Sequence, residues 1–305
     1  MQRMPSVCGW IAAGLLAVGC GPADRSGGGE PQVDATTPPG PDARTPPTPP
    51  IEPDGAAGTD SGPTDPLPPP MENGAVFAHT ATDLYKIDPV TFAVAPVGPF
   101  GWPAGGFDQM TDIAIDGAGR IIGVSFTKVY EVDPNNASCR LLSTMLAGSF
   151  NGLSFVPAEQ VGATGPDVLV GSRNTDGKIF RIDPATGAAV EIGDMGPGMK
   201  SSGDIVSVRG FGTVATVTTG IGIGTPDQLV RLDPITFHAT PIGTNTAFTH
   251  LWGLGFWAGK VFGFSDTGAF IQIDTQTGVG TQIQPGGQSW WGAAVTTLAP
   301  PTDPG

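Results

Sequence analysis

A phrase of alternating apolar residues that ends in Asp-Pro or Asp-Thr recurs five times in this sequence, and it predicts an all-β fold, a five-bladed β-propeller. Successive phrases stand 41 to 50 residues apart, which is room for four short strands and their turns. Gly and Asn/Asp turns separate the strands inside each repeat, as in an antiparallel meander. The aspartates of the phrase are Asp88, Asp133, Asp183, Asp233 and Asp274.

The second repeat shows the internal order most clearly. Its strands are expected at residues 111–116, 121–126, 128–133 and 139–142. Each segment alternates apolar and polar residues, and each is bounded by turn-forming residues. Four antiparallel strands in this order make one blade.

The two ends of the repeat array are incomplete, and each supplies what the other lacks. The first repeat, which begins near Gly74, has no innermost strand, whereas residues 291–298 form a strand with no blade of its own. That last segment resembles the opening strands at 151–155 and 252–256. We therefore expect it to complete the first blade and close the ring, which removes exposed strand edges.

Residues 1–20 have the composition of a secretory signal peptide. The apolar run at 7–18 is too short to span a bilayer. The ending Leu16-Ala-Val-Gly-Cys20 resembles a bacterial lipobox, which implies that Cys20 carries lipid and becomes the mature N-terminus. An ordinary cleaved signal and a retained anchor are the alternatives. The lipobox implies an extracytoplasmic protein whose membrane partner is reached through Cys20, and Gly21 favours the outer membrane over the inner.

Residues 21–73 hold fifteen prolines, many acidic residues and few large apolar side chains. Such a segment cannot bury enough surface to offset its ordering entropy, so we expect a disordered linker. It would serve as a stalk between membrane and propeller, or as a plain spacer. Residues 299–305 are expected to be a disordered tail, which leaves 74–298 for the propeller.

The net charge of −14 and the three cysteines exclude several classes of protein. No basic run occurs anywhere, so nucleic acid is not an expected partner and the lipid is the expected membrane attachment. Removal of the signal and lipidation of Cys20 would leave Cys139 alone, so no disulfide framework is expected. We interpret Cys139 as a small buried hydrophobe, with a reactive thiol as the alternative.

The repeated Asp-Pro has two interpretations. A carboxylate can accept a backbone N–H two residues on, and proline presets φ for a turn. Calcium binding is the alternative, because loop aspartates suit a hard cation. One carboxylate at each of five separated rims cannot converge on one ion, so we favour turn chemistry.

These repeats resemble the broad WD40/YVTN-like β-propeller superfamily, and in particular its secreted bacterial members. The likeness covers residues 74–298 and depends on the apolar-x-apolar-Asp-Pro-x-Thr-Gly turn, as at 179–187. The Trp-Asp ending and Gly-His pair of true WD40 repeats are absent. The resemblance implies the fold and no particular activity, because the superfamily includes lectin-like binders, scaffolds, lactonases and quinone-dependent enzymes.

Loops that join the fourth strand of one blade to the first strand of the next should gather on one face, opposite the Asp-Pro turns. They are rich in aromatic, carboxylate and amide side chains, which suit a sugar ring or a peptide. The alternative is packing, since Trp252 and Trp291 could fill a narrow channel. The candidate ligand-binding residues are Trp102, Asp108, Asp112, Asn151, Asp204, His250, Trp252, Trp290 and Trp291.

Signals for catalysis are weak, so no catalytic residue, metal site or cofactor is assigned. The three histidines lack metal-binding spacing, and no Gly-x-Ser-x-Gly elbow occurs. The sequence favours a monomeric, lipid-anchored binding module for a glycan or an envelope protein. The first alternative is a hydrolase of lactonase or glycosidase type that uses Asp108, Asp112 or Asp204. A purely structural envelope component is the second alternative.

Overall fold

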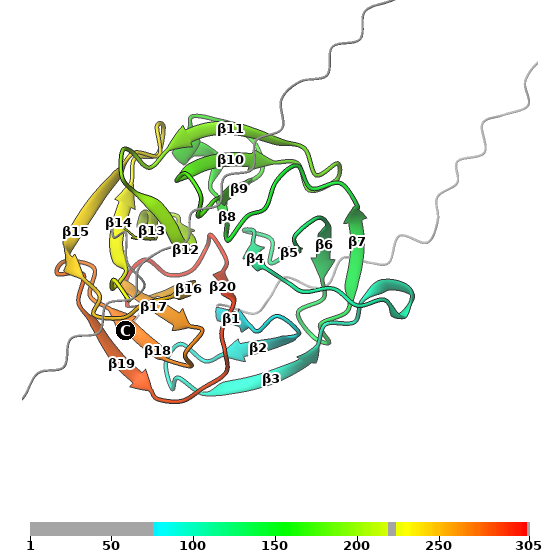
Figure 1. Ribbon diagram of the computed structural model, residues 1–305, viewed down its shortest axis with the longest axis horizontal. Coiled ribbons are helices and arrows are strands. Elements are labelled where there is room, and N and C mark those ends of the chain that lie inside the picture. The colour runs from blue at the N-terminus through cyan, green and yellow to red at the C-terminus, as the bar shows by residue number, and fades with distance from the viewer. Residues whose placement is uncertain (1–75, 219–223, 304–305) are drawn as a thin grey trace, which may run out of the picture. The chain divides into compact units, whose positions relative to one another are not determined.

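The computed structural model describes residues 76–218 and 224–303, and these residues form a ring of five four-stranded antiparallel sheets (Figure 1). The predicted five-bladed propeller is therefore confirmed. The predicted signal peptide, Cys20, the whole of the predicted linker and its boundary with the propeller lie outside the described residues. No helix in the described ranges is both long and apolar enough to cross a membrane.

Within each blade the strands run from the axis outward. Blade 1 consists of β20 (Gly292–Val295), β1 (Val76–His79), β2 (Asp83–Ile87) and β3 (Val94–Pro99). Blade 2 consists of β4 (Asp112–Ile115), β5 (Ile121–Val124), β6 (Val129–Val132) and β7 (Cys139–Ser143). Blade 3 consists of β8 (Gly152–Val156), β9 (Val168–Ser172), β10 (Lys178–Ile182) and β11 (Ala189–Asp194).

The last two blades follow the same order. Blade 4 consists of β12 (Lys200–Val208), β13 (Gly212–Thr218), β14 (Gln228–Leu232) and β15 (Ala239–Asn245). Blade 5 consists of β16 (Leu251–Trp257), β17 (Lys260–Ser265), β18 (Phe270–Ile273) and β19 (Gly280–Gln284). Two short 3₁₀ turns, η1 (Pro103–Gly105) and η2 (Ala158–Val161), interrupt the loops.

The ring is closed by pairing of the two ends of the array, as the sequence predicts. Strand β20 pairs antiparallel with β1, with Val295 opposite Val76 and Gly292 opposite His79. Figure 1 shows the red C-terminal strand beside the cyan first strand at the centre of the ring. With β20 in place, all five blades have four strands.

Burial decreases from the axis to the rim, and it explains the strand sequences. Every residue of β8 is buried, so that strand is almost wholly apolar, whereas the outer strand β11 has no buried residue. The core lies between neighbouring blades, where aromatic side chains such as Phe262, Phe264 and Phe270 pack against one another. Cys139 at the start of β7 is buried as expected, and burial together with the nearby charge of Asp108 raises the pKa of its thiol to about 12.

The Asp-Pro phrases form the tight turns that the sequence predicts. The Asp88 carboxylate accepts the backbone N–H groups of Val90 and Thr91 at 2.8 and 2.9 Å. Asp133, Asp183, Asp233 and Asp274 accept the N–H two residues on in the same way. Backbone hydrogen bonds also lower the pKa of Asp88, as they do for Asp183, Asp233 and Asp274. These turns all lie on one face of the ring.

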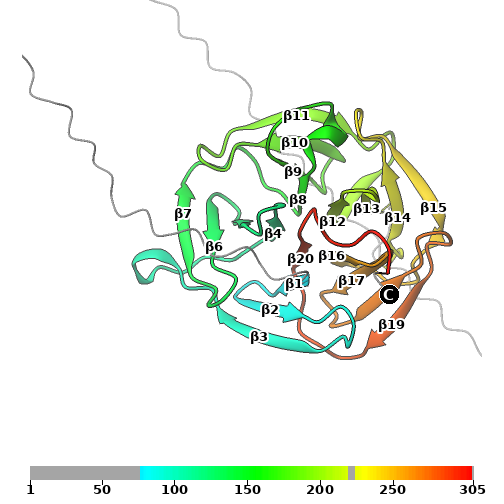
Figure 2. The same cartoon turned by 180° about the vertical axis from the view of Figure 1, so that it is seen from behind.

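The C-terminal segment continues past β20 and closes the axis on the face of the Asp-Pro turns. Hydroxyls of Thr296 and Thr297 donate to the Asp116 carbonyl and the Asp167 carboxylate, at 2.8 and 2.6 Å. The Thr297 carbonyl accepts the N–H of Arg209, and the Pro300 carbonyl accepts that of Ala258. These partners lie in blades 2, 3, 4 and 5, and Figure 2 shows the red segment running across the centre of the ring.

This packing shifts the predicted boundary between propeller and tail. Ala299, expected in the disordered tail of residues 299–305, is only 2% exposed, and Pro300 is hydrogen-bonded. The start of that segment is therefore a structural part of the propeller. The sequence does not indicate this role, because residues 296–300 have no strand pattern. We call residues 296–300 the cross-brace, since their hydrogen bonds join blade 1 to the four other blades.

Candidate binding face

Five equivalent residues, one on each inner strand, form a buried layer. They are Asp112, Gly152, Asp204, Gly253 and Gly292. The backbones meet so closely that a Cβ on Gly253 would lie 2.6 Å from the carbonyl carbon of Gly292. A Cβ on Gly292 would collide with the Asp112 carboxylate. Three glycines thus leave the room that two carboxyl groups fill.

The Asp204 carboxylate joins three blades. One oxygen accepts the N–H of Ile205 at 2.6 Å and that of Leu153 at 3.4 Å, and the other accepts the N–H of Leu254 at 2.7 Å. These donors belong to β12, β8 and β16, so a single side chain replaces water as the acceptor for three inner strands.

Asp112 and His79 complete the buried layer. One Asp112 oxygen accepts the N–H of Ile113 at 2.8 Å, and it lies 3.7 Å from His79 Nε2. The His79 Nδ1–H donates to the Thr80 carbonyl, so Nε2 carries the lone pair. Burial lowers the pKa of His79 to about 4, and the imidazole is neutral near pH 7.

The two buried carboxyl groups both resist ionisation. Burial raises the pKa of both well above the usual range, and the charge of Asp204 adds to the effect on Asp112. Asp204 accepts three backbone N–H groups and Asp112 accepts one, so the hydrogen bonds favour the charged form of Asp204 more, and we expect the proton on Asp112. Both side chains are 0% exposed, so they are structural acids beneath the surface.

Two tryptophans lie one residue further toward the face that carries the blade-to-blade loops, here called the loop face. Trp252 and Trp291 are half-buried, and their rings meet edge to face at 6.2 Å. The His250 imidazole stacks on Trp252 at 5.7 Å and is held by the Asp266 carboxylate at 3.0 Å. We call His250, Trp252 and Trp291 the aromatic row.

A further acid lies beside the aromatic row. Asp227 is 3% exposed, and its carboxylate accepts the N–H of Leu251 at 2.7 Å. Burial raises the pKa of Asp227 to about 6, against that hydrogen bond and the favourable charge of His250. Asp227 and Asp266 were not predicted, because neither belongs to a motif. Asp227 reaches the row across the boundary between blades 4 and 5, and Asp266 reaches it from the β17–β18 turn of blade 5.

The remaining predicted site residues lie elsewhere on the loop face. Asp108 accepts the Tyr130 hydroxyl at 2.7 Å and the Lys128 ammonium at 3.1 Å, while Trp102 packs edge to face on Tyr130. Partial burial opposes ionisation, but these hydrogen bonds lower the pKa of Asp108. They also fix the loop at 100–111 over blade 2, as a group separate from the aromatic row.

Asn151 and Trp290, like Asp112, each have a buried polar side-chain atom without a hydrogen-bond partner among the described residues. Asn151, just before β8, has an unpartnered side-chain oxygen near the axis. Trp290 is 1% exposed and packs edge to face on Tyr85 and Phe264 at 5.2 and 5.6 Å. Its indole nitrogen also lacks a partner among the described residues. The neighbouring Trp291 belongs to the aromatic row, so the two adjacent tryptophans pack against different residues.

The described residues contain no group of three or more His, Cys, Asp or Glu side chains arranged to hold a metal ion. No protein-family model and no curated protein sequence matches the chain. The sheet topology defines the chain as a β-propeller.

Solved structures similar to the chain include the following three. A nidogen/laminin complex matches with 9% identity and a TM-score of 0.47 over 75% of this chain and 100% of that one. A symmetrical protein described for its de novo evolutionary emergence matches with 16% identity and a TM-score of 0.46, over 74% and 99%. TolB from Acinetobacter baumannii matches with 16% identity and a TM-score of 0.40, and the alignment covers 70% of this chain and 52% of TolB.

Proposed function

We propose that the protein is a binding module that takes a glycan on its loop face through the aromatic row. The observation that carries this proposal is the stacking of His250 on Trp252, next to the edge-to-face contact of Trp252 with Trp291. The rings offer rigid apolar surface at low entropic cost. The Asp266 carboxylate at the end of the row supplies a hydrogen-bond acceptor for hydroxyl groups.

The closed axis supports a surface site over a channel site. Asp112 and Asp204 fill the ring beneath the tryptophans, and residues 296–300 cover its other end. A ligand of the loop face therefore rests on half-buried rings. Their supporting backbone is fixed, because the Trp291 N–H donates to the His79 carbonyl at 2.8 Å.

A hydrolase is not favoured by any observation. Two of its three proposed acids, Asp112 and Asp204, are fully buried. The third, Asp108, is held by Tyr130 and Lys128. A hydrolase needs an acid whose proton reaches the substrate.

We also propose that the protein is lipid-anchored at Cys20 outside the cytoplasm, in the outer membrane, with residues 21–73 as a stalk. Support comes from the lipobox-like ending and the proline-rich composition alone. Mature bacterial lipoproteins carry more than one acyl chain, which suffices for stable anchoring. Cys20→Ser should move the protein from the membrane fraction to the soluble fraction of the envelope. Retention of the variant in the membrane would contradict the anchor.

The binding proposal is tested by screening the purified full chain on a glycan array and in pull-downs from envelope extract. Trp252→Ala and Trp291→Ala should each lower affinity for a bound glycan about tenfold or more. Trp257→Ala is the matched control, because Trp257 is also partly buried but stands at the opposite end of β16. A protein partner in place of any glycan, or equal loss in the control, would contradict the proposal.

A further inference from the structure

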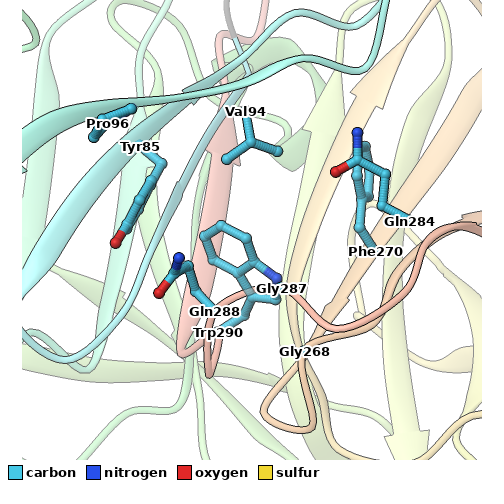
Figure 3. A pocket seen from close by; sticks show the side chains of 9 residues that line it. All are labelled: Tyr85, Val94, Pro96, Gly268, Phe270, Gln284, Gly287, Gln288 and Trp290. Atoms are coloured by element: carbon cyan, nitrogen blue, oxygen red, sulfur yellow. The ribbon is translucent and has the colours of Figure 1, made fainter.

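A cavity of about 400 Å³ opens where blade 5 meets blade 1. Its walls come from strands β2, β3 and β18, the end of β19, the β17–β18 turn and the loop before β20 (Figure 3). The volume is in the lower part of the range for small-molecule sites. The lining residues are Tyr85, Val94, Pro96, Gly268, Phe270, Gln284, Gly287, Gln288 and Trp290.

The cavity has a hydrogen-bond donor that the protein leaves unused. Trp290 Nε1 is buried and lacks an acceptor among the described residues. Figure 3 shows this nitrogen on the side of the indole that faces Phe270 and Gln284. Buried polar groups are rarely left unpaired, so an unpaired indole N–H at a cavity wall indicates a ligand acceptor.

Glycine keeps the approach to this donor open. A Cβ on Gly287 would lie 3.3 Å from Trp290 Nε1 and 3.1 Å from the Gly268 carbonyl oxygen. The Gly287 N–H donates to that same carbonyl at 2.8 Å, which fixes the loop beside the indole. Any side chain at position 287 would therefore occupy the space next to Nε1.

An acceptor faces the donor across the cavity. The Gln284 Nε2 donates to the Phe92 carbonyl at 2.8 Å, which determines the orientation of the amide. Its oxygen is then left as an acceptor, and Figure 3 shows it directed toward the side where Val94 and Trp290 lie. A donor and an acceptor facing one space suit a hydroxyl group, which both gives and takes a hydrogen bond. A carbonyl could use only the donor.

The lining carries no charge near neutral pH. Tyr85 is its one ionisable side chain, and burial, with the nearby Asp83, raises the pKa of that phenol. A charged ligand would lose its hydration without gaining a counter-charge. The half-buried Tyr85 ring and the apolar side chains of Val94 and Pro96 instead offer surface for C–H groups.

From these observations we propose that the cavity between blades 5 and 1 binds a neutral saccharide unit, with one hydroxyl between Trp290 Nε1 and the Gln284 amide oxygen. This site is separate from the aromatic row, and the inference does not depend on the proposed function. The Gln288 amide at the rim is available to a second hydroxyl.

Calorimetric titration of the full chain tests the site. The probes are the neutral methyl glycosides of glucose, galactose and mannose, the charged sugars glucuronate and glucosamine, and a Pro-Pro-Thr-Pro-Pro peptide. We expect a neutral glycoside to bind with a Kd of about 1 mM or tighter. Trp290→Phe and Gln284→Met should each weaken it about tenfold, and Gly287→Ala should block it.

Trp257→Phe is the matched control for this site. It makes the same chemical change away from the cavity, and it should leave glycoside binding unchanged. Thermal melts check that every variant is folded. The proposal is overturned if no neutral glycoside binds, if only the charged sugars or the peptide bind, or if folded Trp290→Phe and Gly287→Ala both retain wild-type affinity.

Discussion

The Asp204 carboxylate accepts the backbone N–H of Leu254 across the boundary between blades 4 and 5, at 2.7 Å. With the bonds from Leu153 and Ile205, this contact makes one buried carboxylate the shared acceptor of three blades. The neighbouring Asp112 accepts one such bond, from Ile113. The backbone donors therefore favour the charged form of Asp204 more than that of Asp112, and we expect the proton on Asp112.

This assignment predicts opposite outcomes for the same substitution at the two acids. Asp204→Asn places an amide NH₂ against backbone donors and should lower the free energy of unfolding by about 2–4 kcal/mol. Asp112→Asn mimics the protonated carboxyl group and should cost less than about 1 kcal/mol. Denaturant unfolding of both variants measures the difference. Equal costs, or a larger cost at Asp112, would show that the charge is assigned to the wrong residue.

The buried His79 predicts loss of stability in mild acid. Its pKa is about 4 in the fold and 6.5 for the unperturbed side chain, so the unfolded state takes up its proton first as the pH falls. The contribution of His79 is complete above pH 6.5 and is lost as the pH falls to about 4. At 1.36 kcal/mol per pKa unit, the loss amounts to up to about 3 kcal/mol. The stability of His79→Gln should vary less over this window, and parallel pH profiles for variant and wild type would count against the neutral imidazole.

Asp227 has the opposite effect on how stability depends on pH. Burial raises its pKa from 3.8 to about 6, so the folded state holds the proton more tightly and stability is lost as the pH rises through that interval. Asp227→Asn keeps an acceptor for the Leu251 N–H and removes the titration. Its stability relative to wild type should therefore increase between pH 4 and pH 7. A constant difference over this range would mean that Asp227 titrates normally.

Because the cross-brace joins blade 1 to the other blades, we expect its removal to lower the stability of the protein. A protein that stops at residue 295 keeps β20 but loses the bonds that residues 296–300 make to four other blades. Each bond contributes about 0.5–1.5 kcal/mol, so the loss should reach several kcal/mol. A chain that stops at residue 302 keeps these bonds and is the control. Equal denaturation midpoints for the two truncated proteins would show that residues 296–300 do not stabilise the ring.

The parts of the fold that repeat could be predicted from the sequence. The Asp-Pro turns are local, and the likeness of Trp291-Gly to Trp252-Gly identified the strand that closes the ring. The contacts of residues 296–300 could not be predicted, because these bonds reach residues 42 to 180 positions away and leave no periodic pattern.

The site was predicted less completely, for physical reasons. Adjacent residues Trp290 and Trp291 have identical side chains, and only the three-dimensional course of the loop places one in a cavity wall and the other in the aromatic row. One feature of the sequence does indicate that Asp112 and Asp204 are buried. Glycine occupies the three equivalent positions, 152, 253 and 292, which indicates an axis too narrow for five side chains.

The most direct test of the account titrates one array-selected glycan into Trp252→Ala and Asp112→Asn side by side. The account predicts that the change in the aromatic row lowers affinity about tenfold or more, while the change at the buried axis leaves it unaltered. Retained affinity in Trp252→Ala together with lost affinity or turnover in Asp112→Asn would contradict it, because the chemistry would then lie at the axis.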